Sequence, residues 1–315
     1  MIYLITGGAG FIGSNIVNEL LSRKEKVRVL DNFATGRREN ISAFNKDKNF
    51  ELIEGDLRNF HIVREAVKGV DFILHQGALP SVPRSINDPI TTNNVNILGT
   101  LNILEAAKEF GVKRVVYASS SSIYGNSIEL TKTEDLPVMP LSPYAISKYT
   151  GERYCQIYYD LYGLETVCLR YFNVFGPNQD PTSQYSAVIP KFIKAIMNDL
   201  SPIIFGDGSQ SRDFTFVQNN VSANLLACFS NEAIGEVINI ACGKSFSVIE
   251  LVNVINKVLN KEIEPIFNKP KKGDIKQSLA DIRKAKKLLN YDVKVQFVEG
   301  IERTIEYYLN ENIIH

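Results

Sequence analysis

The chain has 315 residues, of which 44% are hydrophobic, so it can bury one large core or two unequal cores. Its 35 Lys and Arg residues balance 35 Asp and Glu residues, and no run of like charges is typical of a nucleic-acid or anionic-membrane surface. We therefore expect a small-molecule partner, and neither nucleic acid nor a membrane.

Short runs rich in β-branched residues alternate with amphipathic segments through the first half of the chain. The runs that predict strands are Ile2–Thr6, Val27–Leu30, Glu51–Glu54, Asp71–His75, Arg114–Ala118 and Thr166–Arg170. Apolar residues at helical spacing predict helices at Phe11–Arg23, Ile62–Val67, Asn93–Phe110 and Ala145–Leu161. This alternation implies right-handed βαβ units, and so an α/β fold with a doubly wound parallel sheet of the Rossmann type.

The pattern changes after about Phe175, where Gly176-Pro177-Asn178 indicates a turn. The next segments are predicted helices separated by longer polar connections: Ala187–Asn198, Val248–Leu259, Ile282–Leu289 and Val298–Leu309, with a polar loop at Gly206–Arg212. We predict a first domain of residues 1–178, which also includes about 213–240, and a smaller α/β domain formed mainly by 179–315.

The cysteines and the N-terminus indicate the compartment. The four cysteines form no CxxC pair and lie in apolar stretches: Cys155, Cys168, Cys228 and Cys242. Such thiols are typically buried and free in a reducing compartment. The N-terminus has no basic leader, and the chain has no apolar run of about 18 residues. We therefore expect a cytoplasmic protein without a metal site.

A glycine-rich turn, Thr6-Gly7-Gly8-Ala9-Gly10-Phe11-Ile12-Gly13, joins the first strand to the first helix. Gly7 permits the tight turn, Gly10 lets the backbone approach a pyrophosphate at the helix N-terminus, and Gly13 allows close helix–strand packing. Asp31 follows about 18 residues later at the end of the second strand, where a carboxylate can bind ribose hydroxyls and select NAD. A capping role is the alternative for Asp31, and Arg37 and Arg38 keep NADP open.

The third predicted strand ends at Glu54-Gly55-Asp56-Leu57. An ordinary Asx turn would explain these residues taken alone. Because doubly wound sheets bind ligands at the carboxyl ends of their strands, we favour a position beside an adenine.

Tyr144 and Lys148 form the catalytic candidate. They stand four residues apart at the start of a helix introduced by Ser142-Pro143, so both side chains share one face. A neighbouring ammonium and a positive nicotinamide ring would favour the phenolate of a tyrosine whose pKa is otherwise near 10. The serine run Ser119–Ser122 directly follows a predicted strand and would place hydroxyls at the same edge of the sheet. The alternatives are a solvated lysine and a polar cap.

Taken together, these motifs resemble the extended branch of the short-chain dehydrogenase/reductase family over nearly the whole chain. The similar motifs are TGGAGFIG, YASSSSIYG, SPYAISK, LRYFNVFGP, SRDFTFV and KKGDIKQS. They look most like UDP-hexose 4-epimerases, and the stretch SVPRSINDP (Ser81–Pro89) is similar to the group that accepts N-acetylated sugars.

The resemblance implies a mechanism: Tyr144 removes the O4 proton, C4 delivers a hydride to tightly held NAD, and hydride returns to the other face of the 4-keto sugar. Ser120, four residues before Tyr124, matches the catalytic Ser/Thr that hydrogen-bonds O4, and Lys148 would bind the nicotinamide ribose and lower the Tyr144 pKa. The implied cofactor residues are Gly7, Gly10, Phe11, Ile12, Gly13, Asp31, Asn32, Asp56, Leu57, Gln76, Ala78, Asn96, Tyr144, Lys148 and Phe172. The implied substrate residues are Ser81, Ser120, Ser121, Ser122, Tyr144, Asn173, Ala187, Val188, Phe205, Arg212, Lys271, Asp274 and Ser278.

Several positions separate this chain from its relatives. Sugar 4,6-dehydratases need an Asp-Glu pair where this chain has Ser121 and Ser122, which disfavours dehydration. Ser278 stands where epimerases restricted to unacetylated sugars carry a bulky Tyr, so it leaves room for an N-acetyl group. Lys271 replaces the usual Arg, and a point charge replaces a bidentate fork on a phosphate. Gln76-Gly77-Ala78 also departs slightly from the commoner pattern.

Three readings remain. The first is a UDP-sugar 4-epimerase acting on UDP-GlcNAc/UDP-GalNAc and UDP-Glc/UDP-Gal. The second is a UDP-uronic acid 4-epimerase or another nucleotide-sugar enzyme of this branch, for which Arg84 could supply a cation beside a carboxylate. The third is a non-catalytic NAD(H) sensor, although such proteins usually lose the Tyr or Lys. By resemblance, we expect a homodimer in which Asn93–Phe110 and Ala145–Leu161 form a four-helix bundle.

Overall fold

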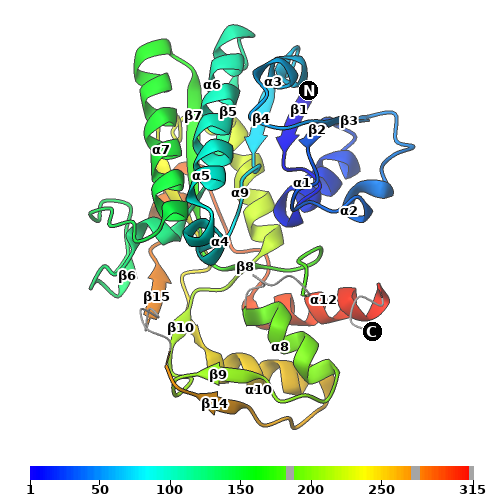
Figure 1. The fold of residues 1–315 in the computed structure, drawn as a ribbon, viewed down its shortest axis with the longest axis vertical. Helices are drawn as coiled ribbons and strands as arrows, with labels where there is room; N and C mark the ends of the chain where they lie inside the picture. The colour runs from blue at the N-terminus through cyan, green and yellow to red at the C-terminus, as the bar shows by residue number, and fades with distance from the viewer. Residues whose placement is uncertain (182–187, 271–276, 312–315) are drawn as a thin grey trace.

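The computed structural model describes residues 1–181, 188–270 and 277–311, and its centre is a seven-stranded parallel sheet (Figure 1). The strand order is β12-β7-β5-β4-β1-β2-β3. The strands are β1 (Ile2–Thr6), β2 (Lys26–Asp31), β3 (Phe50–Glu54), β4 (Phe72–His75), β5 (Arg114–Ser120), β7 (Glu165–Tyr171) and β12 (Val237–Ile240). From β1 the chain adds β2 and β3 on one side, and from β4 it adds β5, β7 and β12 on the other, so the strand order reverses between β1 and β4. The predicted doubly wound α/β fold is confirmed.

Helices cover both faces of this sheet because consecutive strand residues point to opposite sides. Ile5 and Val116 pack on one face, while their neighbours Leu4 and Val115 pack on the other. The first face is covered by α1 (Phe11–Ser22), α9 (Val217–Phe229) and α11 (Arg283–Leu289). The second face is covered by α3 (Phe60–Val67), α6 (Gly99–Glu109) and α7 (Pro143–Tyr162).

A second region lies below the sheet in Figure 1, around α8 (Val188–Met197), α10 (Val248–Leu259) and α12 (Phe297–Asn310). Its core includes stacked and edge-on aromatic rings of Phe175, Phe214, Phe216 and Phe297. Short strands complete the region: β8 (Val174–Phe175), β9 (Ile203–Phe205), β10 (Ser211–Arg212), β11 (Thr215–Phe216), β13 (Phe246–Ser247), β14 (Ile266–Asn268) and β15 (Gln277–Ala280).

One strand ties the two regions together. β6 (Thr131–Lys132) belongs to the long connection between β5 and α7, and it pairs with β15 at the edge of the four-stranded sheet β13-β10-β15-β6. The connection between β5 and α7 is therefore hydrogen-bonded to the second region. The division into domains stays a prediction, although α9 and β12, from the segment 213–240, pack on or within the central sheet.

The structure differs from the predicted elements at several points. The segment expected as one helix, Asn93–Phe110, is α5 (Pro89–Asn93), a π-helical turn at Asn94–Leu98, and α6. The polar loop expected at Gly206–Arg212 ends in β10. All four cysteines are buried and free, as expected. Within the described residues, none of the helices combines the length and apolar character that crossing a membrane requires.

Candidate active site

A pocket of about 360 Å³ opens at the carboxyl ends of β1, β2, β4 and β5. This edge, where the strand order reverses, is the usual ligand site of doubly wound sheets. Most of the predicted cofactor residues line it: Gly7, Gly10, Phe11, Ile12, Gly13, Asp31, Asn32, Asp56, Leu57, Gln76, Ala78, Tyr144 and Lys148. Elements from the first 148 residues thus meet around one cavity.

The glycine-rich turn has the geometry expected of a dinucleotide loop. Gly7 has a φ of +66°, and a Cβ there would lie 2.8 Å from the Gly77 Cα. A Cβ at Gly13 would lie 2.2 Å from the Gly7 carbonyl oxygen, so only glycine permits this contact. A Cβ at Gly10 would meet only the Gly7 oxygen, at 3.1 Å, which leaves the N-terminus of α1 open to the pocket. The loop therefore fits a pyrophosphate group.

Asp31 is fixed at the end of β2 by backbone donors. Its Oδ2 accepts a hydrogen bond from the Ala9 N–H at 2.9 Å, and its Oδ1 accepts one from the Phe33 N–H at 2.8 Å. Burial raises the pKa of Asp31, and these backbone hydrogen bonds oppose that shift. The carboxylate holds the glycine-rich turn against β2 and lines the pocket, where it can accept further hydrogen bonds from ribose hydroxyls.

Two arginines near Asp31 have carboxylate neighbours of their own. Arg38 lies 2.7 Å from Glu54, and its guanidinium stacks 3.9 Å from the ring centroid of Phe33. Arg37 lies 3.7 Å from Glu39. Because each guanidinium already faces a carboxylate, this edge is less suited to a 2′-phosphate, which favours NAD over NADP.

Asp56 and Asn32 form the wall beside β3. The Asn32 amide donates to Asp56 at 2.8 Å, and Arg58 binds the same carboxylate at 2.7 Å. The hydrogen bond from Arg58 holds the pKa of Asp56 down at about 2. The carboxylate is therefore charged at neutral pH, while the neighbouring Leu57 presents an apolar surface.

The catalytic pair stands at the start of α7. Ser142 caps this helix by accepting a hydrogen bond from the Ala145 N–H at 3.1 Å, which fixes the first turn. The Lys148 ammonium donates to the Ala118 carbonyl oxygen at the end of β5, at 2.8 Å. Burial lowers the pKa of Lys148 to about 8. The ammonium is thus fixed against the strand end and titrates near pH 8.

Tyr144 is partly buried, and its phenol lies within reach of the Ser120 hydroxyl. Burial raises its pKa, and the Ser120 hydroxyl opposes that shift. The sequence analysis expected Lys148 to lower this pKa. In the protein chain Lys148 is not among the groups that lower the pKa of Tyr144, and its ammonium donates to the Ala118 carbonyl instead.

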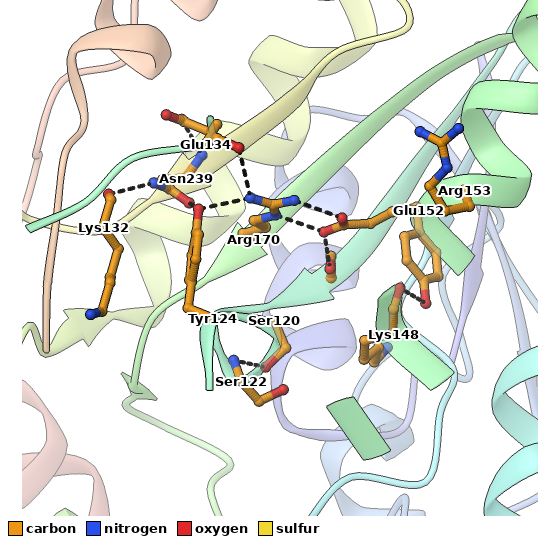
Figure 2. Close-up of polar contacts among 12 residues, drawn as sticks. Ser120, Ser122, Tyr124, Lys132, Glu134, Lys148, Glu152, Arg153, Arg170 and Asn239 are labelled. Carbon is orange, nitrogen blue, oxygen red and sulfur yellow. Dashed lines mark hydrogen bonds and ion pairs between the residues drawn. The ribbon is translucent and has the colours of Figure 1, made fainter. Parts of the chain in front are cut away.

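The serines after β5 form a short 3₁₀ turn, Ser121–Tyr124. Ser120 begins this turn by accepting a hydrogen bond from the Ser122 N–H at 3.2 Å, as Figure 2 shows. The Ser122 hydroxyl oxygen is buried without a hydrogen-bond partner. Ser121 is only partly buried. The Ser122 hydroxyl is therefore free to bind a polar group.

Several predicted ligand residues lie outside the pocket lining, including Ser120–Ser122 and the three described next. Asn96 lies behind it, with its side chain bound to the Leu79 N–H at 2.7 Å and to Ser147 at 3.0 Å. Phe172 is fully buried against Tyr124. The Ser81 hydroxyl accepts a hydrogen bond from the backbone of α4 (Val82–Asn87). Direct ligand contacts of these residues remain predictions, although Asn96 positions Leu79, which does line the pocket.

The predicted substrate residues lie around the second region. Asn173 is exposed with a φ of +36°, and its amide donates to the Asp213 carbonyl at 3.0 Å. Arg212 and Ser278 are register partners on β10 and β15. Phe205 ends β9, and Val188 begins α8. The predictions for Ala187, Lys271 and Asp274 lie outside the described residues.

Sequence reasoning missed a buried hydrogen-bond network and a buried ion pair near the pocket. Tyr171 lines the pocket, and its hydroxyl joins Gln76 and Asn224 in a closed set of hydrogen bonds of 2.7–3.2 Å. A buried ion pair of Glu152 and Arg170 lies behind Ser119. The spacing of Glu152, four residues after Lys148 on the same helix face, was the available signal.

Comparison with known proteins places these features in context. The model of the NAD dependent epimerase/dehydratase family matches residues 3–241. The UDP-glucose 4-epimerase of Mycolicibacterium smegmatis is 37% identical over 312 residues, covering 98% of this chain and 99% of that protein.

Solved structures give the same result. The UDP-N-acetylglucosamine 4-epimerase of Methanobrevibacter ruminantium M1, in complex with UDP-N-acetylmuramic acid, is 40% identical with a TM-score of 0.93, covering 98% of each chain. The UDP-glucuronic acid 4-epimerase of Bacillus cereus, in complex with UDP-glucuronic acid and NAD, is 33% identical with a TM-score of 0.91, covering 99% of this chain and 100% of that one. The likeness thus spans relatives named for different sugars.

Proposed function

Because the chain belongs to the NAD dependent epimerase/dehydratase family and its relatives are UDP-sugar 4-epimerases, we propose that it interconverts UDP-GlcNAc with UDP-GalNAc and UDP-Glc with UDP-Gal. The observation that supports this proposal is that Tyr144 and Lys148 line the dinucleotide pocket together with Ser119, the residue directly before Ser120. A chain that only sensed NAD(H) would have no need for this arrangement.

The residues of the pocket fit NAD. The open N-terminus of α1 at Gly10 would take the pyrophosphate, and the Asp31 carboxylate would take the adenosine ribose hydroxyls. Lys148 would bind the nicotinamide ribose. When bound, NAD supplies a hydride acceptor that can return the same hydride.

The chain's own residues then carry the proton. As the C4–H bond gives up its electron pair as hydride, the O4 proton passes to the Tyr144 phenolate, either directly or through the Ser120 hydroxyl. The Ser120 hydroxyl within reach of Tyr144 favours the anionic phenolate, and the Lys148 charge lies one helical turn away. When the sugar presents its other face, Tyr144 returns the proton to O4.

The substrate side supports a nucleotide sugar with an N-acetyl group. Ser278 carries a small side chain, and its register partner Arg212 carries a cation suited to a phosphate. Asn173, at the exposed end of β7, would donate to the diphosphate. The acetyl group would therefore find room beside Ser278.

A UDP-uronic acid 4-epimerase is the alternative. Arg84 is half-buried in the first turn of α4, near the pocket residue Pro80, and could pair with a C6 carboxylate. The B. cereus relative is named for UDP-glucuronic acid. The two candidates predict different products from a panel of sugars.

We also propose a homodimer. α6 and α7 pack against each other, and apolar side chains remain exposed on and beside them: Leu98, Ile146, Ile157, Leu161 and Tyr162. A second copy of the chain would bury this surface in a four-helix bundle. Light scattering coupled to size exclusion should give twice the monomer mass of 35.3 kDa.

The test of function incubates the purified protein, without added cofactor, separately with UDP-GlcNAc, UDP-Glc and UDP-glucuronic acid. NMR or chromatography resolves the 4-epimers. UDP-GalNAc is the expected product, together with UDP-Gal from UDP-Glc. Turnover of UDP-glucuronic acid alone would instead support the role of Arg84, and no product even with added NAD would contradict the epimerase proposal.

A further inference from the structure

Three consecutive residues at the end of β5 are each tied to a different turn of α7. Ser120 lies within reach of Tyr144 and opposes the rise of its pKa, and the Ala118 carbonyl accepts a hydrogen bond from Lys148 at 2.8 Å. The residue between these two, Ser119, makes the third contact: its hydroxyl donates a hydrogen bond to Glu152 Oε1 at 2.5 Å. The α7 partners are spaced four residues apart, so one helix face holds the strand end at three levels.

The third contact is anchored by a buried ion pair. Arg170 on β7 donates from Nε to Glu152 Oε1 and from Nη2 to Glu152 Oε2, both at 2.9 Å. The side chains of Arg170 and Glu152 are only 4% and 1% exposed. Arg170 also stands directly opposite Ser119 in the register of β5 and β7. The Glu152 carboxylate on α7 therefore joins β5 through Ser119 and β7 through Arg170.

The same arginine also holds the segment on the other side of Ser120. Its Nη1 donates at 2.8 Å to the hydroxyl of Tyr124, the last residue of the 3₁₀ turn that follows Ser120. The Tyr124 hydroxyl in turn donates to Asn239 on β12 at 2.7 Å. Figure 2 shows Arg170 between Glu152 and Tyr124. The chain is thus fixed one residue before Ser120 and four residues after it.

An arginine at the opposite end of the same two strands provides a comparison. Arg114 on β5 pairs with Glu165 on β7 at 2.7 Å, and the two residues are register partners. Arg114 is 1% exposed, while Glu165 is 32% exposed. Neither residue lines the pocket. Both ends of the strand pair therefore carry a buried arginine, but only one end adjoins Tyr144 and Ser120.

We propose that Glu152 and Arg170 are positioning residues that fix Ser120 and Lys148 relative to Tyr144 for proton transfer at O4. This inference rests on the proposed epimerase function. Neither residue is needed to touch the substrate, since Glu152 acts through Ser119 and through the charge it presents to Lys148. Proton transfer is sensitive to such positioning, because a displacement of about 1 Å can cost about 100-fold in rate.

The charge of Glu152 also acts on Lys148, which lies one turn away. Burial lowers the pKa of Lys148, and the Glu152 and Cys155 groups raise it. Titratable or charged groups reach Lys148 from three elements: Tyr144, Glu152 and Cys155 on α7, Tyr117 on β5, and His75 on β4. Removing the Glu152 charge therefore lowers the pKa of Lys148, so its ammonium is lost at a lower pH.

The test compares Glu152→Gln with the matched control Glu165→Gln. Glu152→Gln should lower kcat by about tenfold or more with KM changed less than about twofold, while Glu165→Gln leaves kcat within about twofold. The basic limb of the kcat profile should move to lower pH in Glu152→Gln alone. Equal kcat and equal pH profiles in the two variants would overturn the inference. A wild-type protein that turns over no sugar would instead show that the proposed function has failed.

A double variant covers the case in which Glu152→Gln fails to fold. Replacing a buried ion pair by apolar residues of similar size is often neutral for stability, whereas removing one partner is costly. Glu152→Leu combined with Arg170→Met should therefore retain the wild-type unfolding temperature and NAD content. Its kcat should still be at least about tenfold below that of the wild type. Recovery of kcat together with stability would mean a structural role only and would contradict the inference.

Discussion

The cofactor side of the pocket and the proposed substrate side, whose residues lie outside the pocket lining, are built in different ways. On the cofactor side, the glycine-rich turn, Asp31 and Asp56 come from the first 60 residues and are held by short backbone contacts to adjacent strands. On the substrate side, Arg212 and Ser278 lie on two short strands that are far apart in sequence. The comparison suggests that the cofactor site is set by the sheet itself, whereas the substrate site depends on how distant segments pair.

A buried carboxylate illustrates how the substrate side is held. Asp213 accepts hydrogen bonds from the backbone N–H groups of Cys242 and Gly243, both at 2.9 Å, and from Ala280 at 3.4 Å. Burial raises the pKa of Asp213 to about 7. This one side chain joins the segment after β10 to the ends of β12 and β15, and it adds to the strand pairing of β10 with β15.

The largest expected effect lies where the two sides meet. Tyr144→Phe removes the phenol that takes the O4 proton, and kcat should fall by about 1,000-fold or more. The NAD content of the purified variant should stay at the wild-type level, because the glycine-rich turn and Asp31 are unchanged. Steady-state kinetics and cofactor extraction measure both quantities. A variant that kept most of its turnover would remove Tyr144 from the mechanism.

A change on the cofactor side should affect every substrate equally. In Gly13→Ala the new Cβ would lie 2.2 Å from the Gly7 carbonyl oxygen, so the turn must shift. We expect a loss of about 1–3 kcal/mol in stability, together with reduced NAD content. Gly111→Ala is the control with nothing near its Cβ, although its φ of +63° adds strain. If Gly13→Ala retained as much NAD as the control, the close approach would not matter for binding.

A change on the substrate side should instead separate the sugars. Ser278→Tyr fills the space proposed for the acetyl group, so turnover of UDP-GlcNAc should fall by about 10- to 100-fold while that of UDP-Glc changes little. NAD content should not change. Parallel loss for both sugars would place Ser278 in general nucleotide binding and weaken the contrast between the two sides.

The smallest effect concerns the sheet beneath the cofactor. His75 is buried between Thr6 and Thr100, and burial together with Lys148 lowers its pKa to about 3. Below about pH 6.5 the unfolded state binds a proton at His75 that the native state excludes. The contribution of His75 to the free energy of unfolding is therefore complete above that pH and is lost as the pH falls.

Between pH 7 and 5.5 this loss should amount to about 1 kcal/mol. Chemical denaturation of the wild type and of His75→Gln at both pH values measures it, because the difference between the two proteins isolates His75. A difference that does not change with pH would show that the imidazole titrates normally.

The sequence alone predicted the cofactor side well. Ile2–Thr6 was predicted with its observed ends, and the other five predicted strands were each placed within two residues. These runs are long, apolar and separated by helices, so their periodicity is strong. The glycine-rich turn could be predicted in detail because each glycine has a local steric reason.

The substrate side could not be predicted to the same depth. Strands of two or three residues, such as β10 and β8, have no periodicity and exist only through their pairing partners. Charge patterns also do not reveal burial, so the ion pair of Glu152 and Arg170 was not predicted, although Glu152 shares a helix face with Lys148. The π-helical turn at Asn94–Leu98 went unnoticed because an extra residue in one turn leaves the overall pattern helical.

The central claim is that the two sides cooperate to take a hydride from C4 and return it to the same sugar. The most direct measurement uses UDP-GlcNAc and UDP-Glc carrying deuterium at C4, incubated with the wild-type protein in ordinary water and followed by NMR. We predict that both epimers keep the deuterium at C4, because the hydride never exchanges with solvent. Loss of the label to water during epimerisation would contradict this account.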